Sequence, residues 1–351
     1  MTIEKSDGGN GQQVLVTGAS GFIGMHCIVQ LLNAGYRVRG TLRNLSRGAA
    51  IQKAVSAQSE FAHELSFVAA NLLEDEGWED AVRDCPFVLH VASPLPRQPP
   101  KHEDELIVPA RDGALRVIKA AAATGVKRLV LTSSVAAIIY GQARDGTETY
   151  DESHWSKLSD DVGAYEKSKT IAERAAWELA ETEAIKSRGL ELVVVNPGFV
   201  LGPILDDDYG TSGELVRKLM KREMPGCPDV GWCMIDVRDV AAAHLSALKA
   251  PDAAGKRFIV ATEHASMHDV AEILDKAFGA RGYKIPLRKL PNWMLKAVAV
   301  VDKTAKLAVP ELGLRQDVSM QRARDVLGIK PRSLEDMVVA MGESLIEHGV
   351  V

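Results

Sequence analysis

The feature that most constrains this chain is a short apolar run at 14–17 that leads into three evenly spaced glycines, Gly18, Gly21 and Gly24. An apolar-periodic segment follows. A strand that turns sharply into a helix forms a cradle for a pyrophosphate, which lies against the positive N-terminus of the helix. Gly18 permits the tight turn, Gly21 lets the main chain approach the phosphates, and Gly24 lets the helix lie close to its strand. The TGxxGxxG spacing, a variant of the dinucleotide fingerprint, predicts a dinucleotide site. A flexible loop is the alternative, and the flanking patterns argue against it.

Strand and helix patterns alternate through the first two-thirds of the sequence. Six short runs rich in Val, Leu and Phe lack strict alternation, as expected for strands covered on both faces. These runs are 14–17, 37–42, 66–69, 87–91, 128–132 and 190–195, and helical periodicity covers 22–33, 112–124 and 165–182. Such alternation predicts an α/β fold with a Rossmann-type, doubly wound parallel sheet, whose ligands bind beyond the carboxyl ends of the strands.

The pattern changes after Pro197, where loops at 202–213 and 224–231 interrupt shorter helices. We expect a disordered lead-in at 1–12 and a dinucleotide-binding Rossmann domain at 13–196. Residues 197–351 are predicted to form mainly a smaller substrate-binding cap. Its segments near 235–262, with a strand at 257–260, are expected to return to the main sheet, and a helix at 333–348 is expected to close the chain.

Composition excludes several functional classes. The chain is 46% hydrophobic and 25% charged with a net charge of −5, which gives no reason to expect nucleic acid or a membrane surface as partner. No apolar stretch reaches the roughly eighteen residues of a membrane helix. The first twelve residues lack a hydrophobic region, so we expect a cytoplasmic protein with four reduced cysteines. Neither CxxC nor HExxH spacing occurs, and no metal site is predicted.

Tyr165 and Lys169 lie four residues apart at the start of a predicted helix, and so share one face of it. A neighbouring ammonium favours the phenolate and lowers the tyrosine pKa from about 10 toward the range useful for general acid catalysis. The predicted fifth strand ends in Thr-Ser-Ser at 132–134, where a hydroxyl could hydrogen bond a substrate carbonyl oxygen. Each feature alone could arise by chance. Together with the glycine turn they favour a catalytic site.

With this combination of motifs the chain resembles the extended short-chain dehydrogenase/reductase family. Within that family it is most similar to the dihydroflavonol reductase, cinnamoyl-CoA reductase and aldehyde reductase group. The matching segments run in family order at 16–24, 35–43, 90–94, 131–134, 150–153, 165–169 and 196–203. The resemblance implies that Ser134 is the catalytic serine and that Tyr165 protonates the carbonyl oxygen. It implies that Lys169 holds the nicotinamide ribose and lowers the tyrosine pKa, and that 197–200 orients the carboxamide.

The same resemblance places further residues around the ligands. The cofactor is expected against Gly18, Ser20, Gly21, Phe22, Ile23, Gly24, Leu72, Ala92, Pro197 and Val200. The substrate is expected against Ser93, Pro94, Tyr140 and Trp232, within loops at 94–104, 140–160 and 202–235. His90 fits a packed core histidine better than a catalytic one, and His154 and Trp155 fit either a substrate contact or the surface.

Basic residues near the second predicted strand bear on the choice of cofactor. NAD enzymes of this type usually place Asp or Glu at the end of that strand. This chain has Arg39 and Arg43 there, with Arg47 beyond and no acid. Arginines suit a 2′-phosphate, so NADP(H) is predicted, with solvated surface arginines as the alternative. Asn71 stands where resembling proteins usually have Asp near the adenine, and its amide can still hydrogen bond the ring.

These observations predict an NADPH-dependent reductase that converts a small aldehyde or ketone to an alcohol, as a monomer or homodimer. One alternative is a sugar-nucleotide epimerase or dehydratase on the same fold, although no basic cluster for a nucleotide diphosphate is evident. Another is a non-catalytic NADPH-sensing regulator. Such proteins commonly lose the tyrosine or the lysine, and this chain keeps both.

Overall fold

The computed structural model describes residues 9–94, 100–143, 145–207, 209–300 and 308–351. Residues 1–8 of the expected lead-in, and residues 95–99, 144 and 208 of the expected substrate loops, lie outside the described residues. Residues 9–12 of the expected lead-in are held by backbone hydrogen bonds. Gly9 donates its N–H to the Ala34 carbonyl at 2.9 Å, and Gly11 donates its N–H to the Gly35 carbonyl at 3.0 Å.

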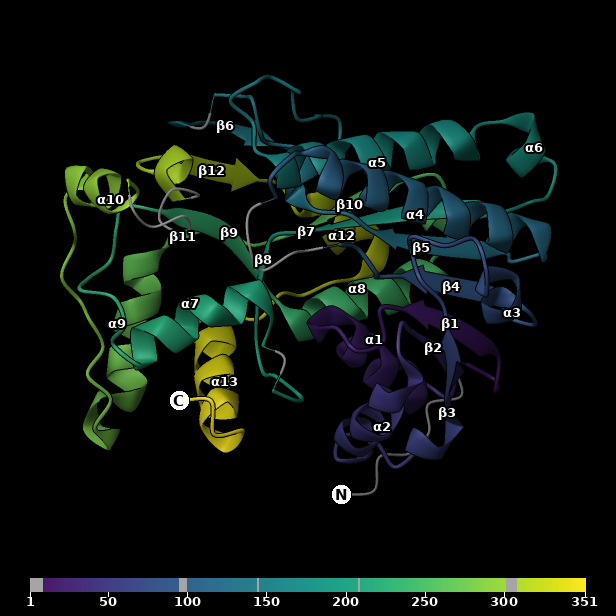
Figure 1. Ribbon diagram of the computed structural model, residues 1–351, viewed down its shortest axis with the longest axis horizontal. Coiled ribbons are helices and arrows are strands. Elements are labelled where there is room, and N and C mark those ends of the chain that lie inside the picture. Colours follow the sequence, from purple (N-terminus) through teal and green to yellow (C-terminus); the bar gives the residue numbers. More distant parts are fainter. Residues whose placement is uncertain (1–8, 95–99, 144, 208, 301–307) are drawn as a thin grey trace.

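A seven-stranded sheet forms the centre of the molecule, with the order β10-β7-β5-β4-β1-β2-β3 (Figure 1). Its strands are β1 (Gln13–Thr17), β2 (Arg37–Leu42), β3 (Leu65–Ala69), β4 (Phe87–His90), β5 (Arg128–Thr132), β7 (Glu191–Pro197) and β10 (Arg257–Val260). Every neighbouring pair is parallel. The order reverses between β1 and β4, so the prediction of a doubly wound parallel sheet is confirmed.

Helices cover both faces of this sheet because successive strand residues point to opposite sides. Val14 and Val16 belong to the apolar cluster that also holds residues of α1 (Phe22–Asn33), α2 (Gly48–Ser56), α8 (Val237–Lys249) and α12 (Gln321–Leu327). Leu15 faces the other cluster, which includes residues of α3 (Trp78–Val82), α4 (Asp104–Ala123), α5 (Ala164–Ala180) and α6 (Glu183–Lys186). Figure 1 shows α4 and α5 on one side of the strands and α1 and α8 on the other.

Two smaller sheets lie beside the main one (Figure 1). One contains β8 (Phe199–Leu201), β9 (Gly231–Asp236) and β11 (His264–Ser266), and the other pairs β6 (Asp145–Tyr150) with β12 (Arg315–Val318). A third apolar cluster packs the first of these sheets against α7 (Gly210–Met220), α9 (Met267–Phe278) and α13 (Leu334–Glu347). The helix α10 (Asn292–Val298) has no buried residue. Short 3₁₀ helices span Leu45–Arg47, Ala62–Glu64, Val135–Ala137, Pro251–Ala253, Gly279–Arg281 and Val309–Glu311.

Two helices differ from the sequence prediction by more than two residues at their start. The helix α4 begins at Asp104, eight residues before the predicted start at 112, and holds Pro109 in its interior. Proline normally breaks a helix, which explains the short prediction. The helix α7 begins at Gly210, inside the predicted loop at 202–213. Among the described residues no helix is long and apolar enough to cross a membrane, and all four cysteines are buried free thiols.

Candidate active site

The glycine turn after β1 is as tight as the sequence argument requires. Gly18 has φ +69°, a left-handed conformation that disfavours a Cβ. A Cβ at Gly18 would lie 3.0 Å from the backbone of Ala92, just beyond β4. A Cβ at Gly24 would lie 2.2 Å from the Gly18 carbonyl oxygen, which leaves no room for it. The first and third glycines are therefore required for the turn itself.

Gly21 has a different role because it faces open space. It is the N-cap of α1, has ordinary extended dihedrals, and a Cβ there would meet only the Gly18 oxygen, at 3.4 Å. No side chain caps α1, and no acidic residue lies in its first turn. The N–H groups at this end, beside Ser20, Phe22 and Ile23, could therefore hold an anion. The cradle that a Cβ would fill thus fits a pyrophosphate.

Thr17, the last residue of β1, connects the glycine turn to β4. Its Oγ1 lies 2.8 Å from Nδ1 of His90 and accepts the Ala92 N–H at 3.0 Å. Burial lowers the pKa of His90 to about 3, so the imidazole is neutral. His90 is accordingly a packed histidine that contacts the Thr17 hydroxyl, and this hydroxyl holds Ala92 near the glycine turn.

Two of the three arginines near β2 have partners within the protein. Arg39 lies in the middle of the strand, and its Nη1 donates to the carbonyls of Asp80, Ala81 and Arg83 at the end of α3. These bonds direct Nη1 of Arg39 to α3, so Arg43 is the better candidate for the expected 2′-phosphate contact, which stays a prediction. Arg47 pairs with Asp206 at 3.6 Å. Arg43 follows the carboxyl end of β2, is exposed, and has no partner among the described residues.

Asn71 and Leu72 follow the carboxyl end of β3 in a local turn. The side-chain oxygen of Asn71 accepts the Leu73 N–H at 3.2 Å, and its Nδ2 donates to Glu74 at 2.9 Å. Leu72 packs against α4, where a Cβ on Gly113 would lie 3.0 Å from it. The Asn71 amide is thus engaged locally at the sheet edge where the adenine was expected.

The predicted catalytic residues come together where β5 ends and α5 begins. Ser134 is the N-cap of a 3₁₀ turn, and its Oγ accepts the Ala136 N–H at 3.1 Å and lies 3.5 Å from the Pro197 carbonyl. Tyr165 lies in the first turn of α5 and hydrogen bonds with Ser134. The Lys169 ammonium is 5.8 Å from the centroid of the Tyr165 ring.

Burial determines the protonation of this group. It raises the pKa of Tyr165 to about 12, although the hydrogen bond from Ser134 acts in the opposite direction. The sequence predicted that Lys169 would lower this pKa; burial instead raises it, and the charge of Glu166 acts in the same direction. Burial also lowers the pKa of Lys169 to about 8, against the charge of Glu173. Tyr165 therefore holds its proton at neutral pH, as a general acid must.

A small cavity of about 20 Å³ lies beside Lys169. Its lining includes His90, Ala92, Ser93, Ser133 and Glu173. The structure therefore brings Ala92 and Ser93, expected on cofactor and substrate, to the same cavity as Lys169. Glu173 and Ser133 were not among the predicted site residues.

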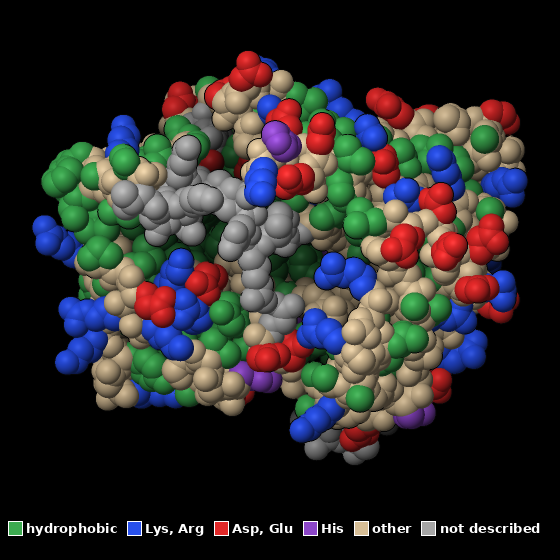
Figure 2. Space-filling view, in the orientation of Figure 1, with side chains coloured by type: hydrophobic (Ala, Val, Ile, Leu, Met, Phe, Trp, Pro, Cys, Tyr) green, Lys and Arg blue, Asp and Glu red, His purple; other side chains and the backbone are tan. Residues whose placement is uncertain are grey.

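The remaining expected substrate residues lie on other elements. Tyr140 donates its backbone N–H to Ser156 at 2.9 Å. Trp232, on β9, stacks on Phe199 with ring centroids 4.7 Å apart. Val200, on β8 beside Phe199, pairs with Ile235. Figure 2 shows hydrophobic side chains in a recess near the middle of this face, with Lys and Arg side chains beside it.

Comparison with known proteins gives consistent matches over most of the chain. Residues 14–261 match the NAD dependent epimerase/dehydratase family. Cinnamoyl-CoA reductase 1 of Petunia hybrida is 34% identical over 284 residues, which cover 80% of each chain. The NADPH-dependent methylglyoxal reductase of Saccharomyces cerevisiae is 36% identical over 293 residues, which cover 79% of this chain and 85% of the relative.

The solved structures agree with these relatives. The yeast methylglyoxal/isovaleraldehyde reductase, complexed with NADPH, superimposes with a TM-score of 0.79 and 28% identity. The match covers 97% of this chain and 100% of that one.

Proposed function

Because this chain belongs to the NAD-dependent epimerase/dehydratase family, we propose that it is an NADPH-dependent reductase that converts an aldehyde or ketone to an alcohol. The observation that carries the proposal is the grouping of Ser134, Tyr165 and Lys169 at the carboxyl edge of the sheet that also bears the glycine cradle. The yeast protein whose structure matches 97% of this chain is named a methylglyoxal/isovaleraldehyde reductase, which supports the proposal.

The cofactor preference rests on two features of this chain. The N-terminus of α1, with Gly21 facing open space and no capping side chain, suits the pyrophosphate. Arg43, exposed beyond β2, suits a 2′-phosphate, since a guanidinium binds phosphate oxygens through paired hydrogen bonds. The relatives named NADPH-dependent point the same way.

The chain's own residues supply the proton chemistry. When bound, NADPH supplies the hydride. Tyr165 gives its phenolic proton to the carbonyl oxygen, and burial keeps that proton in place until an acceptor arrives. Ser134, hydrogen bonded to Tyr165, offers its hydroxyl to the same oxygen. Lys169 would hold the nicotinamide ribose, and its ammonium, 5.8 Å from the centroid of the Tyr165 ring, would favour loss of the phenolic proton.

NADPH consumption across a panel of aldehydes and ketones, including methylglyoxal, tests the proposal, with Tyr165→Phe as the control variant. We expect turnover by the wild type and a loss of about 100-fold or more in the variant. Full activity of Tyr165→Phe would rule out the mechanism. Tight NADPH binding without any turnover would favour a sensor, and turnover of a UDP- or GDP-sugar would favour an epimerase or dehydratase.

A further inference from the structure

A buried carboxylate lies one helical turn beyond Lys169 on α5. Glu173 is 1% exposed, yet both of its oxygens have partners. Oε2 accepts the Ser133 hydroxyl at 2.6 Å and the Asn196 Nδ2 at 2.8 Å. Oε1 accepts the Arg257 Nε at 2.6 Å. One side chain thus joins α5 to the ends of β5 and β7 and to β10.

The same contacts reach the proposed catalytic group. Asn196 Nδ2, besides binding Glu173, donates to the backbone oxygen of Ser134 at 3.1 Å. Ser133, the other partner of Glu173, is the residue before Ser134. Resting on the proposed function, we propose that Glu173 is a positioning residue that fixes the Ser134 segment through Asn196 and Ser133 and places a carboxylate one helical turn from Lys169, at the same small cavity.

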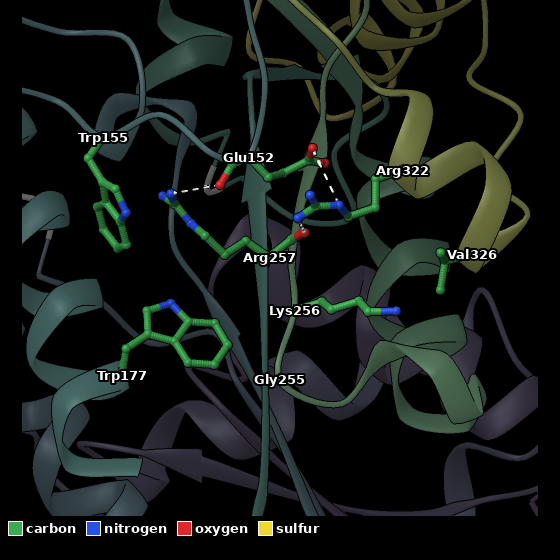
Figure 3. Close-up of a pocket in the computed structure, with 8 residues that line it drawn as sticks. All are labelled: Glu152, Trp155, Trp177, Gly255, Lys256, Arg257, Arg322 and Val326. Atoms are coloured by element: carbon green, nitrogen blue, oxygen red, sulfur yellow. Dashed lines mark hydrogen bonds and ion pairs between the residues drawn. The ribbon is translucent and has the colours of Figure 1, made fainter. Parts of the chain in front are cut away.

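Arg257 contacts Glu173 from the opposite side, through the ion pair between its Nε and Oε1. Its Nη1 donates to the carbonyls of His154 at 2.8 Å and Glu152 at 3.4 Å, and its guanidinium lies 3.7 Å from the centroid of the Trp155 ring (Figure 3). A buried ion pair is costly to desolvate and adds little stability over a well-packed apolar pair. A buried charge beside an active-site lysine is therefore better explained by its effect on that lysine.

The large cavity at the edge of the sheet, about 480 Å³, forms the outer side of this network (Figure 3). Two of its four charged side chains, Glu152 and Arg322, form an ion pair with each other. Glu152 accepts the Ile259 N–H at 3.0 Å and pairs with Arg322 at 3.7 Å, and Arg322 donates to the Arg257 carbonyl at 3.2 Å. These bonds hold the backbone from which Arg257 reaches Glu173.

Two substitutions separate the effect of the Glu173 charge from the effect of its position. Burial lowers the pKa of Lys169, and the carboxylate of Glu173 opposes that effect. Glu173→Gln removes the charge and places an NH₂ group among donors. Glu173→Asp keeps the charge but shortens the side chain, which withdraws it from Ser133 and Asn196. Glu178→Gln, at an exposed position of the same helix, is the matched control.

The test measures kcat and the Kd for NADPH, the latter from nucleotide fluorescence, as functions of pH. For Glu173→Gln we expect kcat to fall about 10- to 100-fold. We expect the alkaline limb of NADPH binding to move to lower pH by about one unit or more, because Lys169 loses its proton earlier. For Glu173→Asp we expect a similar fall in kcat with the limb unmoved, and for Glu178→Gln no change.

The outcomes are distinct. If Glu173→Gln folds and has the kcat of the wild type and the same alkaline limb of NADPH binding, the inference is overturned. If Glu173→Gln does not fold, Glu173→Asp decides: a reduced kcat with the wild-type limb supports the inference, and a wild-type kcat overturns it. A wild type that reduces no carbonyl refutes the proposed function instead, and the pH limb of NADPH binding still tests the role of Glu173.

Discussion

Replacing Gly21 by alanine should impair nucleotide binding without harming the fold. Gly21 has φ −89° and ψ 161°, which alanine adopts without strain. The added Cβ would make only an ordinary contact, 3.4 Å from the Gly18 oxygen. It would, however, project over the open N-terminus of α1, where the proposal places the pyrophosphate.

The magnitudes follow from these contacts. Alanine at an N-cap costs up to about 1 kcal/mol, and the lower entropy of the unfolded chain offsets about 0.4–1 kcal/mol of that. We therefore expect the Tm to lie within about 2 °C of the wild-type value. A methyl group that intrudes on a close-packed contact costs about 1–3 kcal/mol, which raises the Kd for NADPH about 5- to 150-fold.

Thermal unfolding and fluorescence titration with NADPH measure the two quantities separately. Gly125→Ala provides the matched control, because Gly125 has φ +79° and nothing within 4 Å of its Cβ position. That variant should lose about 1–2 kcal/mol of stability from the left-handed backbone and bind NADPH normally. A wild-type Kd in Gly21→Ala would refute the placement of the phosphates.

Two further predictions concern charge. Arg43→Ala should weaken NADPH binding about 10-fold and leave NADH binding unchanged. Arg39→Ala should leave the ratio of the NADPH and NADH dissociation constants unchanged and lower the Tm, because Arg39 binds the end of α3. Equal effects of both variants on this ratio would contradict the assignment of Arg43 to the 2′-phosphate. Burial lowers the pKa of His26 and His244 to about 4 and that of His90 to about 3. The unfolded chain binds protons at these three histidines more tightly than the folded chain does. The free energy of unfolding should therefore be highest above about pH 6.5 and fall by about 4 kcal/mol per pH unit on acidification. Urea unfolding midpoints that stay constant down to about pH 5 would contradict this prediction.

Sequence patterns predicted the parts of the structure that depend on local chemistry. The predicted ranges at 22–33, 37–42, 128–132 and 257–260 coincide with a helix and three strands, because buried parallel strands and their crossover helices have strong apolar signatures. Gly18 and Gly24 also lie where the turn needs them.

Other features depend on which face of an element a residue occupies, or on distant partners. Arg39 lies opposite Leu15 in the sheet and so points to the cluster on the α3 side, which a strand boundary alone does not specify. Glu173 is four residues after Lys169, a spacing that places it on the same helix face. Its partner Arg257 comes 84 residues later, so only the fold reveals the ion pair.

The position of β10 in the sequence affects how the chain folds during its synthesis. This strand pairs with β7, although about sixty residues that include β8, α7, β9 and α8 separate the two in sequence. Until Arg257–Val260 leave the ribosome, β7 is an unpaired edge of apolar residues, and Glu173 is a buried charge without its guanidinium. A chain cut short before β10 would therefore keep the whole glycine turn and the residues Ser134, Tyr165 and Lys169, but would be prone to aggregate and to need a chaperone.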